Sequence, residues 1–187
     1  MFKWEARKAW DVLLGAFFGE FSSADGVVLY LLTNPYHNEG LDFEAEVERF
    51  ASRLKRPVET LPRVEILPRG VPQSRLPALL NAMDAFVLPS RGEGWGRPHV
   101  EAMAMGLPII ATNWSGPTEF MTEENGYPVA LDYGDDGTGD GLVEIDEGAF
   151  KGHRWAAPSV ESLRGAMRSV VEGGENAKVR FAFKVYH

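Results

Sequence analysis

The residues with the clearest chemical potential lie between Pro89 and Glu119, where two carboxylates flank a glycine-rich turn. Glu93 lies inside the turn among three alternating glycines, and Glu101 follows shortly after Pro98. Glycine allows sharp turns and close approach of the backbone to a ligand. Carboxylates accept hydrogen bonds from hydroxyl groups. The stretch therefore predicts a site for an elongated, polyhydroxylated ligand that both carboxylates contact.

The same stretch predicts phosphate binding. Pro98 suits the first position of a helix, because the N–H that it lacks would have no partner within the helix. Free N–H groups in the first turn of a helix, together with the helix dipole, attract anions. In a continuous helix, Glu93 and Glu101 would lie about 12 Å apart along the axis. The glycines and Pro98 argue against that, so we expect Glu93 to curl back and phosphates to lie between the two carboxylates.

The rest of the chain alternates apolar strands with amphipathic helices. The pattern predicts helices at 7–21, 41–54, 75–83, near 98, 117–121 and 159–171, and strands at 27–32, 64–67, 85–88, 109–111 and 127–131. The run from Val27 to Leu32 is apolar throughout, which is typical of a strand buried on both faces. Ser159 is the expected N-cap of the last helix. This alternation predicts a doubly wound α/β fold with a parallel sheet, whose ligand lies at the carboxyl ends of the strands.

Composition excludes several classes of function. The chain has 187 residues, 44% of them hydrophobic, which is enough for one domain with a sizeable core. Its net charge of -8 argues against nucleic acid or an anionic membrane as a partner. It contains no cysteine, so disulfides and thiolate metal sites are excluded. The sequence shows neither a signal-peptide pattern nor an apolar run of the ~20 residues that span a membrane, which favours the cytoplasm.

At the central motif the sequence resembles a known family. Glu93, seven intervening residues and Glu101, within GEGWGRPHVEAMAMGLPIIAT, resemble the Glu-x7-Glu signature of retaining, nucleotide-sugar-dependent glycosyltransferases of the GT-B fold (glycosyl transferases group 1, family 4-like). Thr112, Gly116 and Glu119 match the next block of that family. The resemblance extends from about residue 2 to 170 and covers only the C-terminal, donor-binding half, which is Rossmann-like.

This resemblance implies an activity and a set of site residues. The expected reaction transfers a hexose from a UDP- or GDP-sugar to an acceptor hydroxyl with retention, without a metal or other cofactor. Glu93 is the expected catalytic residue, because it would hydrogen-bond the transferred sugar, and Glu101 would hold the ribose hydroxyls. The other donor-binding positions that the resemblance implies are Lys3, Lys8, Gly70, Val71, Gly94, Trp95 and Gly96.

Some of these positions depart from the family pattern or have simpler interpretations. Lys3 replaces an Arg that contacts the donor phosphates, and a Lys lacks the bidentate guanidinium fork. Ala9 replaces a usual Gly. Gly70 and Val71 match a loop that contacts the nucleotide base, but an ordinary connection between strand and helix remains an equal alternative. For Trp95 we expect packing to be the main task.

Three other patterns fail on closer inspection. His99 lies on the motif helix, but in the family a catalytic His belongs to the N-terminal half. The segment from Asp132 to Gly141 has Gly134 and Val143 where an EF-hand loop needs ligands, so we expect an acidic surface loop. No dinucleotide-binding Gly-x-Gly-x-x-Gly motif is present, which argues against a nicotinamide enzyme.

Both ends of the sequence differ from the family. Only Met1 and Phe2 correspond to its first buried strand, so we expect an unpaired sheet edge there. Residues 178–187, KVRFAFKVYH, alternate like a strand where the family has a helix. We interpret residues 1–171 as a donor-binding domain and 172–187 as an atypical tail. The domain would need an N-terminal GT-B half, or a partner chain that supplies it, for activity. A non-catalytic nucleotide-sugar-binding module and an inactive truncated product remain alternatives.

Overall fold

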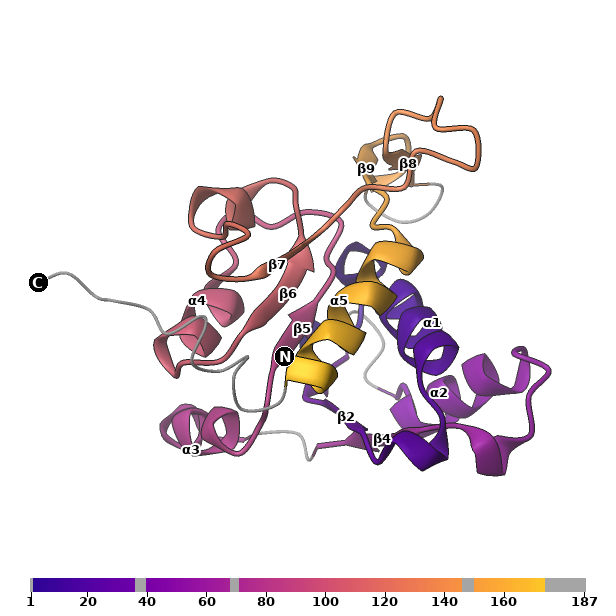
Figure 1. The fold of residues 1–187 in the computed structure, drawn as a ribbon, viewed down its shortest axis with the longest axis vertical. Helices are drawn as coiled ribbons and strands as arrows, with labels where there is room; N and C mark the ends of the chain where they lie inside the picture. The colour runs from indigo at the N-terminus through magenta and orange to yellow at the C-terminus, as the bar shows by residue number, and fades with distance from the viewer. Residues whose placement is uncertain (1, 36–39, 68–70, 146–149, 174–187) are drawn as a thin grey trace, which may run out of the picture.

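The computed structural model describes residues 2–35, 40–67, 71–145 and 150–173, and its helices and parallel strands alternate as predicted (Figure 1). The helices are α1 (Trp10–Glu20), α2 (Phe43–Ser52), α3 (Leu76–Asn81), α4 (Arg97–Ala104) and α5 (Val160–Gly173). The parallel strands are β1 (Phe2–Lys3), β2 (Val28–Leu31), β3 (Thr33–Asn34), β4 (Arg63–Ile66), β5 (Phe86–Leu88), β6 (Ile109–Thr112) and β7 (Tyr127–Val129). The predicted α/β class is confirmed.

The parallel strands form three separate ladders rather than one continuous sheet. β1 pairs with β3, β2 pairs with β4, and β5, β6 and β7 form the third ladder. The carbonyl of Leu31 accepts a hydrogen bond from Leu67 on the β4 side, and the next carbonyl, that of Leu32, accepts one from Phe2. Successive carbonyls of a strand point to opposite edges, so β1 lies on the edge of β2–β3 that faces away from β4. In the described part of the chain, no ladder joins this edge of β2 to β5.

The prediction that the Val27–Leu32 strand is buried on both faces is wrong. Leu29 and Leu31 are buried in the core, whereas Val28 and Tyr30 are 36% and 43% exposed. An apolar side chain favours burial, but it is buried only where another element of the fold covers it.

The first helix begins later than predicted. Ala6–Lys8 form a 3-10 turn, and Ala9 has a left-handed backbone with φ 50°, so α1 starts at Trp10 rather than at Arg7. The cations at positions 3, 7 and 8 therefore lie before α1 and not in its first turn. A left-handed residue cannot continue a right-handed helix, and this is why the periodic pattern was misleading at this end.

Helices α1 and α5 lie side by side over one face of the strands (Figure 1). Arg168 of α5 links the two helices through ion pairs to Glu20 at 2.7 Å and Asp25 at 2.9 Å. The Ser159 hydroxyl accepts a hydrogen bond from the amide of Ser162, which confirms the predicted N-cap of α5. These contacts hold α5 against the segment that leads into β2.

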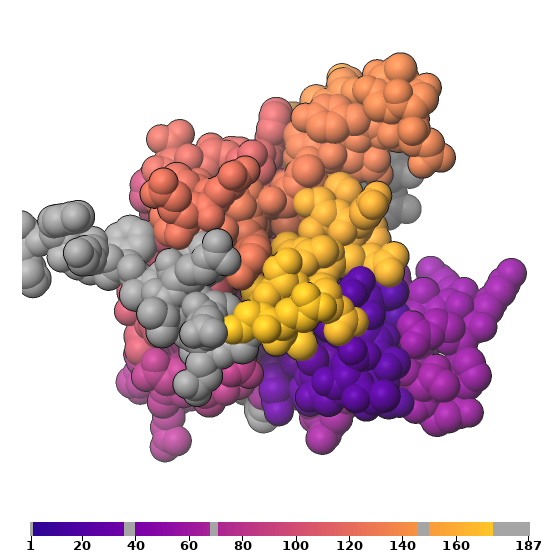
Figure 2. Space-filling model, in the orientation of Figure 1, coloured from indigo at the N-terminus to yellow at the C-terminus, as the bar shows by residue number. Residues whose placement is uncertain are grey.

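An antiparallel hairpin, which the sequence did not predict, follows β7. β8 (Leu142–Glu144) pairs with β9 (Arg154–Ala156). The acidic segment before it projects from the body of the molecule, as Figure 2 shows in orange. Asp132 and Asp136 accept hydrogen bonds from nearby amides, and Asp140 pairs with Arg154. The expected acidic surface loop is confirmed as an exposed, turn-rich segment.

Candidate functional site

A compact cluster of charges centres on Glu93, in the loop between β5 and α4. The Lys8 Nζ lies 2.6 Å from one Glu93 carboxylate oxygen, and the Arg7 guanidinium lies 3.4 Å from the other. The side chains of Glu93 and Lys8 are only 9% and 10% exposed. The sequence places these residues far apart along the chain, and the fold brings them together at the carboxyl end of β5.

The environment of Glu93 favours its ionised form. Burial raises its pKa, but the hydrogen bond and charge of Lys8, the charge of Arg7 and a hydrogen bond from Ser90 outweigh burial. As a result, the pKa of Glu93 lies below its ordinary value. The loop therefore presents a carboxylate that stays negative at neutral pH and is neutralised by adjacent cations.

The loop that carries Glu93 is fixed from both sides. Arg7 donates a hydrogen bond to the carbonyl of Gly92 at 2.7 Å. The amide of Glu93 donates to the Ser115 hydroxyl at 3.0 Å, and its carbonyl accepts from the Gly116 amide at 3.1 Å. Residues 112–119, the second block noted in the sequence, thus act as a support for the first.

Gly116 is required by close packing against this loop. A Cβ at this position would lie 2.7 Å from the Cα of Trp95 and 2.8 Å from its amide nitrogen. Such distances are far below van der Waals contact, and the obstructing atoms belong to the backbone. Any side chain at Gly116 would therefore displace the Glu93 loop.

Arg91 is a positioning residue that the sequence analysis missed. Its guanidinium forms a bidentate ion pair with Asp11 of α1, at 2.8 and 3.0 Å, and its amide donates to the carbonyl of Arg7 at 2.8 Å. It thereby ties the Gly-rich loop to the segment that carries Lys8. Nothing in the spacing of Arg91 and Asp11 along the chain signals this pair.

Gly96 is the N-cap of helix α4, and its φ of 93° suits glycine. A Cβ there would lie 2.8 Å from the Nδ1 of His99. His99 is fully buried, and its two ring nitrogens face the carbonyls of Gly96 and Leu88 at 3.2 and 3.3 Å. Burial lowers the pKa of His99 and favours the neutral ring. Its contacts are thus those of a packed core histidine.

A cavity of about 310 Å³ opens beside the charge cluster. Its lining consists of Phe2, Lys3, Glu5, Arg7, Lys8, Pro98 and Phe150. Three cations thus face the first turn of α4, where Pro98 lies. Positive side chains and the positive end of the α4 dipole both favour an anion at this place.

Comparison with known families decides the identity of the chain. A family model described as glycosyl transferases group 1 matches residues 1–138, which include the whole charge cluster and both motif blocks. The chain belongs to the glycosyl transferases group 1 family. The fold and the placement of the Glu-x7-Glu motif agree with that membership.

The known relatives match different shares of this chain. Over 62 residues it is 40% identical to the lipopolysaccharide core biosynthesis mannosyltransferase LpsB of Rhizobium meliloti, a match that covers 32% of this chain and 18% of LpsB. The C-terminal domain of the group 1 family protein LpcC of Francisella tularensis is similar in structure, with a TM-score of 0.67, 18% identity and coverage of 97% of this chain and 77% of that one. HepE of Anabaena, solved with UDP and glucose, gives a TM-score of 0.65 at 18% identity, with coverage of 97% of this chain and 40% of HepE. These structures show that the fold is that of a GT-B C-terminal domain, and the chain spans less than half of HepE.

The other residues that the family resemblance assigns to the donor site lie in different places. Glu101 lies on α4, partly exposed, and pairs with Arg97 at 3.4 Å. Trp95 packs on Phe120 with ring centroids 5.4 Å apart, and half of its surface stays exposed. Val71 is partly buried and does not line the cationic cavity. Gly70 lies outside the described residues.

Two other kinds of site are not found in the described part of this chain. In the described ranges, no three His, Asp or Glu residues are grouped so that they could hold a metal ion. Within the same ranges, no helix has the length and apolar character needed to cross a bilayer. At the carboxyl end of β6, the Thr112 hydroxyl is the one buried side-chain polar atom of the described residues without a hydrogen-bond partner.

Proposed function

We propose that this chain is the nucleotide-sugar donor-binding domain of a retaining glycosyltransferase, which transfers a hexose from a UDP- or GDP-sugar to an acceptor hydroxyl. The observation that carries the proposal is the buried cluster of Lys8, Arg7 and Glu93 beside the first turn of α4. It combines cations for a diphosphate with a carboxylate for sugar hydroxyls. It lies entirely within the segment that the family model matches.

The diphosphate of the donor would bind in the cationic cavity. Lys3, Arg7 and Lys8 line it, and Pro98 in the first turn of α4 forms part of its wall. On arrival, the diphosphate replaces Glu93 as the partner of Lys8. The same cations then stabilise the negative charge that develops on the departing nucleoside diphosphate, in the place that a metal ion takes in other transferases.

Glu93 and Glu101 would orient the two sugars of the donor. Glu93 is ionised and therefore accepts hydrogen bonds from hydroxyls of the transferred hexose, near the backbone of Gly94, Trp95 and Gly96. Glu101, on α4, would accept hydrogen bonds from the ribose hydroxyls once its ion pair with Arg97 is broken. Gly70 and Val71 are proposed to border the nucleotide base.

Two relatives support the type of donor. LpsB is named a mannosyltransferase, and HepE was solved with UDP and glucose. Both names point to hexoses, and neither fixes the nucleotide for this chain. The acceptor would be bound by an N-terminal GT-B half or a partner chain, since this chain spans 18% of LpsB and 40% of HepE.

The test is ligand-dependent thermal melting of the purified chain with UDP, GDP, UDP-glucose and GDP-mannose. A ligand at 100 times its Kd stabilises a fold by about 2.7 kcal/mol, which gives a shift of several degrees. Lys8→Met and Glu101→Gln should reduce the shift. Arg63→Gln removes an exposed ion pair with Glu65 outside the site and should leave the shift unchanged.

Three outcomes separate the alternatives. A cooperative melt that no nucleotide shifts would contradict the donor-binding proposal. A shift without hydrolysis or transfer, even with an added N-terminal half, would favour a non-catalytic binding module. Turnover that disappears in Glu93→Gln would establish the transferase.

A further inference from the structure

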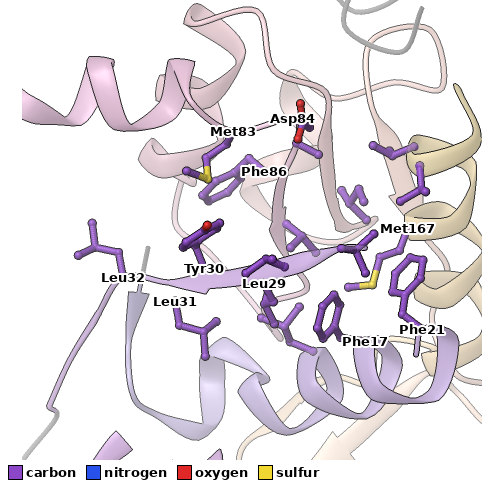
Figure 3. Close-up of a pocket in the computed structure, with 18 of the residues that line it drawn as sticks. Phe17, Phe21, Leu29, Tyr30, Leu31, Leu32, Met83, Asp84, Phe86 and Met167 are labelled. Atoms are coloured by element: carbon purple, nitrogen blue, oxygen red, sulfur yellow. The ribbon is translucent and has the colours of Figure 1, made fainter. Parts of the chain in front are cut away.

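Two cavities formed by the described residues differ in the chemistry of their walls. The larger, of about 720 Å³, is lined mainly by apolar side chains such as Leu29, Phe86 and Met167 (Figure 3). Among the described residues, no lysine or arginine lines it. The cationic cavity of about 310 Å³ is lined by three cations together with Phe2 and Phe150. The combination of charged and aromatic walls, which suits a sugar diphosphate, thus belongs to the smaller cavity.

Phe150 lies between β8 and β9, in a segment to which the family match assigns no role. The family model ends at residue 138, whereas β8 begins at Leu142 and β9 ends at Ala156. The other described residues that line the cationic cavity all lie within the matched range. The hairpin thus adds one wall to a cavity that the matched part of the chain otherwise forms.

A tight turn and two aromatic neighbours fix the position of Phe150. Its carbonyl accepts a hydrogen bond from the amide of His153 at 3.0 Å, across a turn in which Gly152 has φ 80°. A positive φ at the third residue of a turn suits glycine. The ring of Phe150 lies 5.1 Å from that of Trp155 and 6.1 Å from that of His153, between centroids. These contacts hold the ring in place beside the cavity.

The base of the hairpin is bound to the glycine-rich loop. The amide of Ala156, a fully buried residue, donates a hydrogen bond to the carbonyl of Arg91 at 3.1 Å. The amide of Arg91 in turn donates to the carbonyl of Arg7 at 2.8 Å. Backbone hydrogen bonds thus connect β9, the loop that carries Glu93 and the turn that carries the cations. A substitution of the Phe150 side chain leaves these backbone bonds intact.

Phe150 stays 39% exposed although it lines a cavity with three cations. A diphosphate gains nothing from an aromatic wall, because its surface is charged. The parts of a nucleotide sugar that have apolar surface are the C–H face of the hexose and the plane of the base. Packing either of them on the ring would remove apolar area from water.

The surroundings of the cavity favour the hexose over the base. Arg7 and Lys8 line the cavity and also contact Glu93, the carboxylate proposed to bind the transferred hexose. A single oxygen joins the hexose to the diphosphate, whereas a ribose separates the base from it. A diphosphate held by these cations therefore brings the hexose to the same walls. Val71, which is proposed to border the base, does not line this cavity.

We propose that Phe150 is a specificity-determining residue, whose ring packs against the C–H face of the transferred hexose. This inference rests on the proposed donor-binding function and deepens it on the sugar side. Glu93 binds hydroxyls of the hexose through hydrogen bonds, and Phe150 binds a face of its ring through apolar contact. Such a wall accepts a sugar face of C–H groups and disfavours a hydroxyl directed into it, because that hydroxyl loses its hydrogen bonds to water.

Calorimetry of UDP against UDP-glucose, and of GDP against GDP-mannose, tests the assignment. Phe150→Ala should raise the Kd of the nucleotide sugar about five- to tenfold and that of the matching nucleoside diphosphate by less than about twofold. Phe150→Tyr, which keeps the ring, should restore the native affinity. Tyr133→Ala is the matched control, because it removes an exposed aromatic residue of the same segment that does not line the cavity. It should leave both Kd values unchanged.

The outcomes separate this inference from the donor-site proposal. An equal rise of both Kd values in Phe150→Ala would show that Phe150 contacts the nucleotide or only supports the cavity, and would overturn this inference while donor binding stands. Unchanged Kd values would overturn it as well. A native chain that binds none of the four ligands would contradict the donor-site proposal and this inference together.

A second measurement does not depend on a change of affinity. In saturation-transfer NMR, selective saturation of the aromatic protons of the native chain should reach the hexose C–H protons of the bound nucleotide sugar. In Phe150→Leu, which keeps an apolar side chain and so protects the fold, this transfer should fall while transfer to the ribose and base stays the same. Equal transfer to the hexose in both proteins would refute the contact.

Discussion

The Lys8–Glu93 pair should make a large, measurable contribution to stability. Removing one partner of a buried ion pair leaves an uncompensated charge and costs about 3–5 kcal/mol. In Lys8→Met, Arg7 remains 3.4 Å from the Glu93 carboxylate and offsets part of that loss. We therefore expect Lys8→Met to lower the free energy of unfolding by about 2–3 kcal/mol, equivalent to about 5–10 °C in Tm for a domain of this size.

The pH dependence of this effect has a definite sign. In the native chain the pKa of Glu93 is lowered, so its contribution to stability is fully present above the unfolded pKa, near 4.5, and is lost as pH falls through the folded pKa. Without Lys8, burial dominates, and the pKa of Glu93 should rise above that value. The variant then gains relative stability as Glu93 takes up a proton. The difference between the two proteins should thus be greatest near neutral pH and shrink as pH falls toward about 4.

Urea unfolding of a double-mutant cycle measures the pair directly. Lys8→Met, Glu93→Gln and the double variant are compared with the native chain at neutral and acidic pH. The double variant should be more stable than Lys8→Met, because it removes the buried unpaired charge. A Lys8→Met loss under about 1 kcal/mol, with no coupling to Glu93→Gln, would show that solvent screens the pair and would refute this reasoning.

Four other substitutions should also change stability or nucleotide binding. Gly116→Ala should destabilise the fold by more than about 2 kcal/mol in urea unfolding and abolish nucleotide binding, because the new Cβ meets the Trp95 backbone. Ala9→Gly should raise stability by about 1 kcal/mol in the same assay, because it relieves a left-handed conformation. Glu101→Gln should weaken nucleotide affinity about tenfold by calorimetry, a loss of about 1.4 kcal/mol, without lowering Tm. Phe2→Ala should lower both Tm and nucleotide affinity, because Phe2 is buried in the core and also lines the cationic cavity, and a loss of only one would contradict this link.

The sequence predicted the elements whose signals are local. The alternation of strands and helices was correct because hydrophobic period reflects local geometry. The cap at Ser159 was correct because a hydroxyl at a helix start has a local partner. The motif between Glu93 and Glu101 was found for a similar reason, since glycines, Pro98 and carboxylates lie within one short stretch.

What the sequence did not predict depends on contacts between distant residues. Arg91 and Asp11 are both ordinary surface residues by type, and only the fold makes them a bidentate pair. Tyr30 is apolar enough for a core, yet the fold leaves it 43% exposed on one face of β2. β8 and β9 were missed because each is short and carries charged residues, so neither shows a clear period.

The donor site is physically linked to the strand β1. The two residues of β1 pair with β3, and the chain then passes directly into the turn that carries Arg7 and Lys8. The pairing of β1 with β3 thus supports the segment from which two of the three cavity cations project. The ordering of β1 and the geometry of the Glu93 cluster should therefore change together, because a shift of β1 along β3 moves Lys8 relative to the Gly-rich loop.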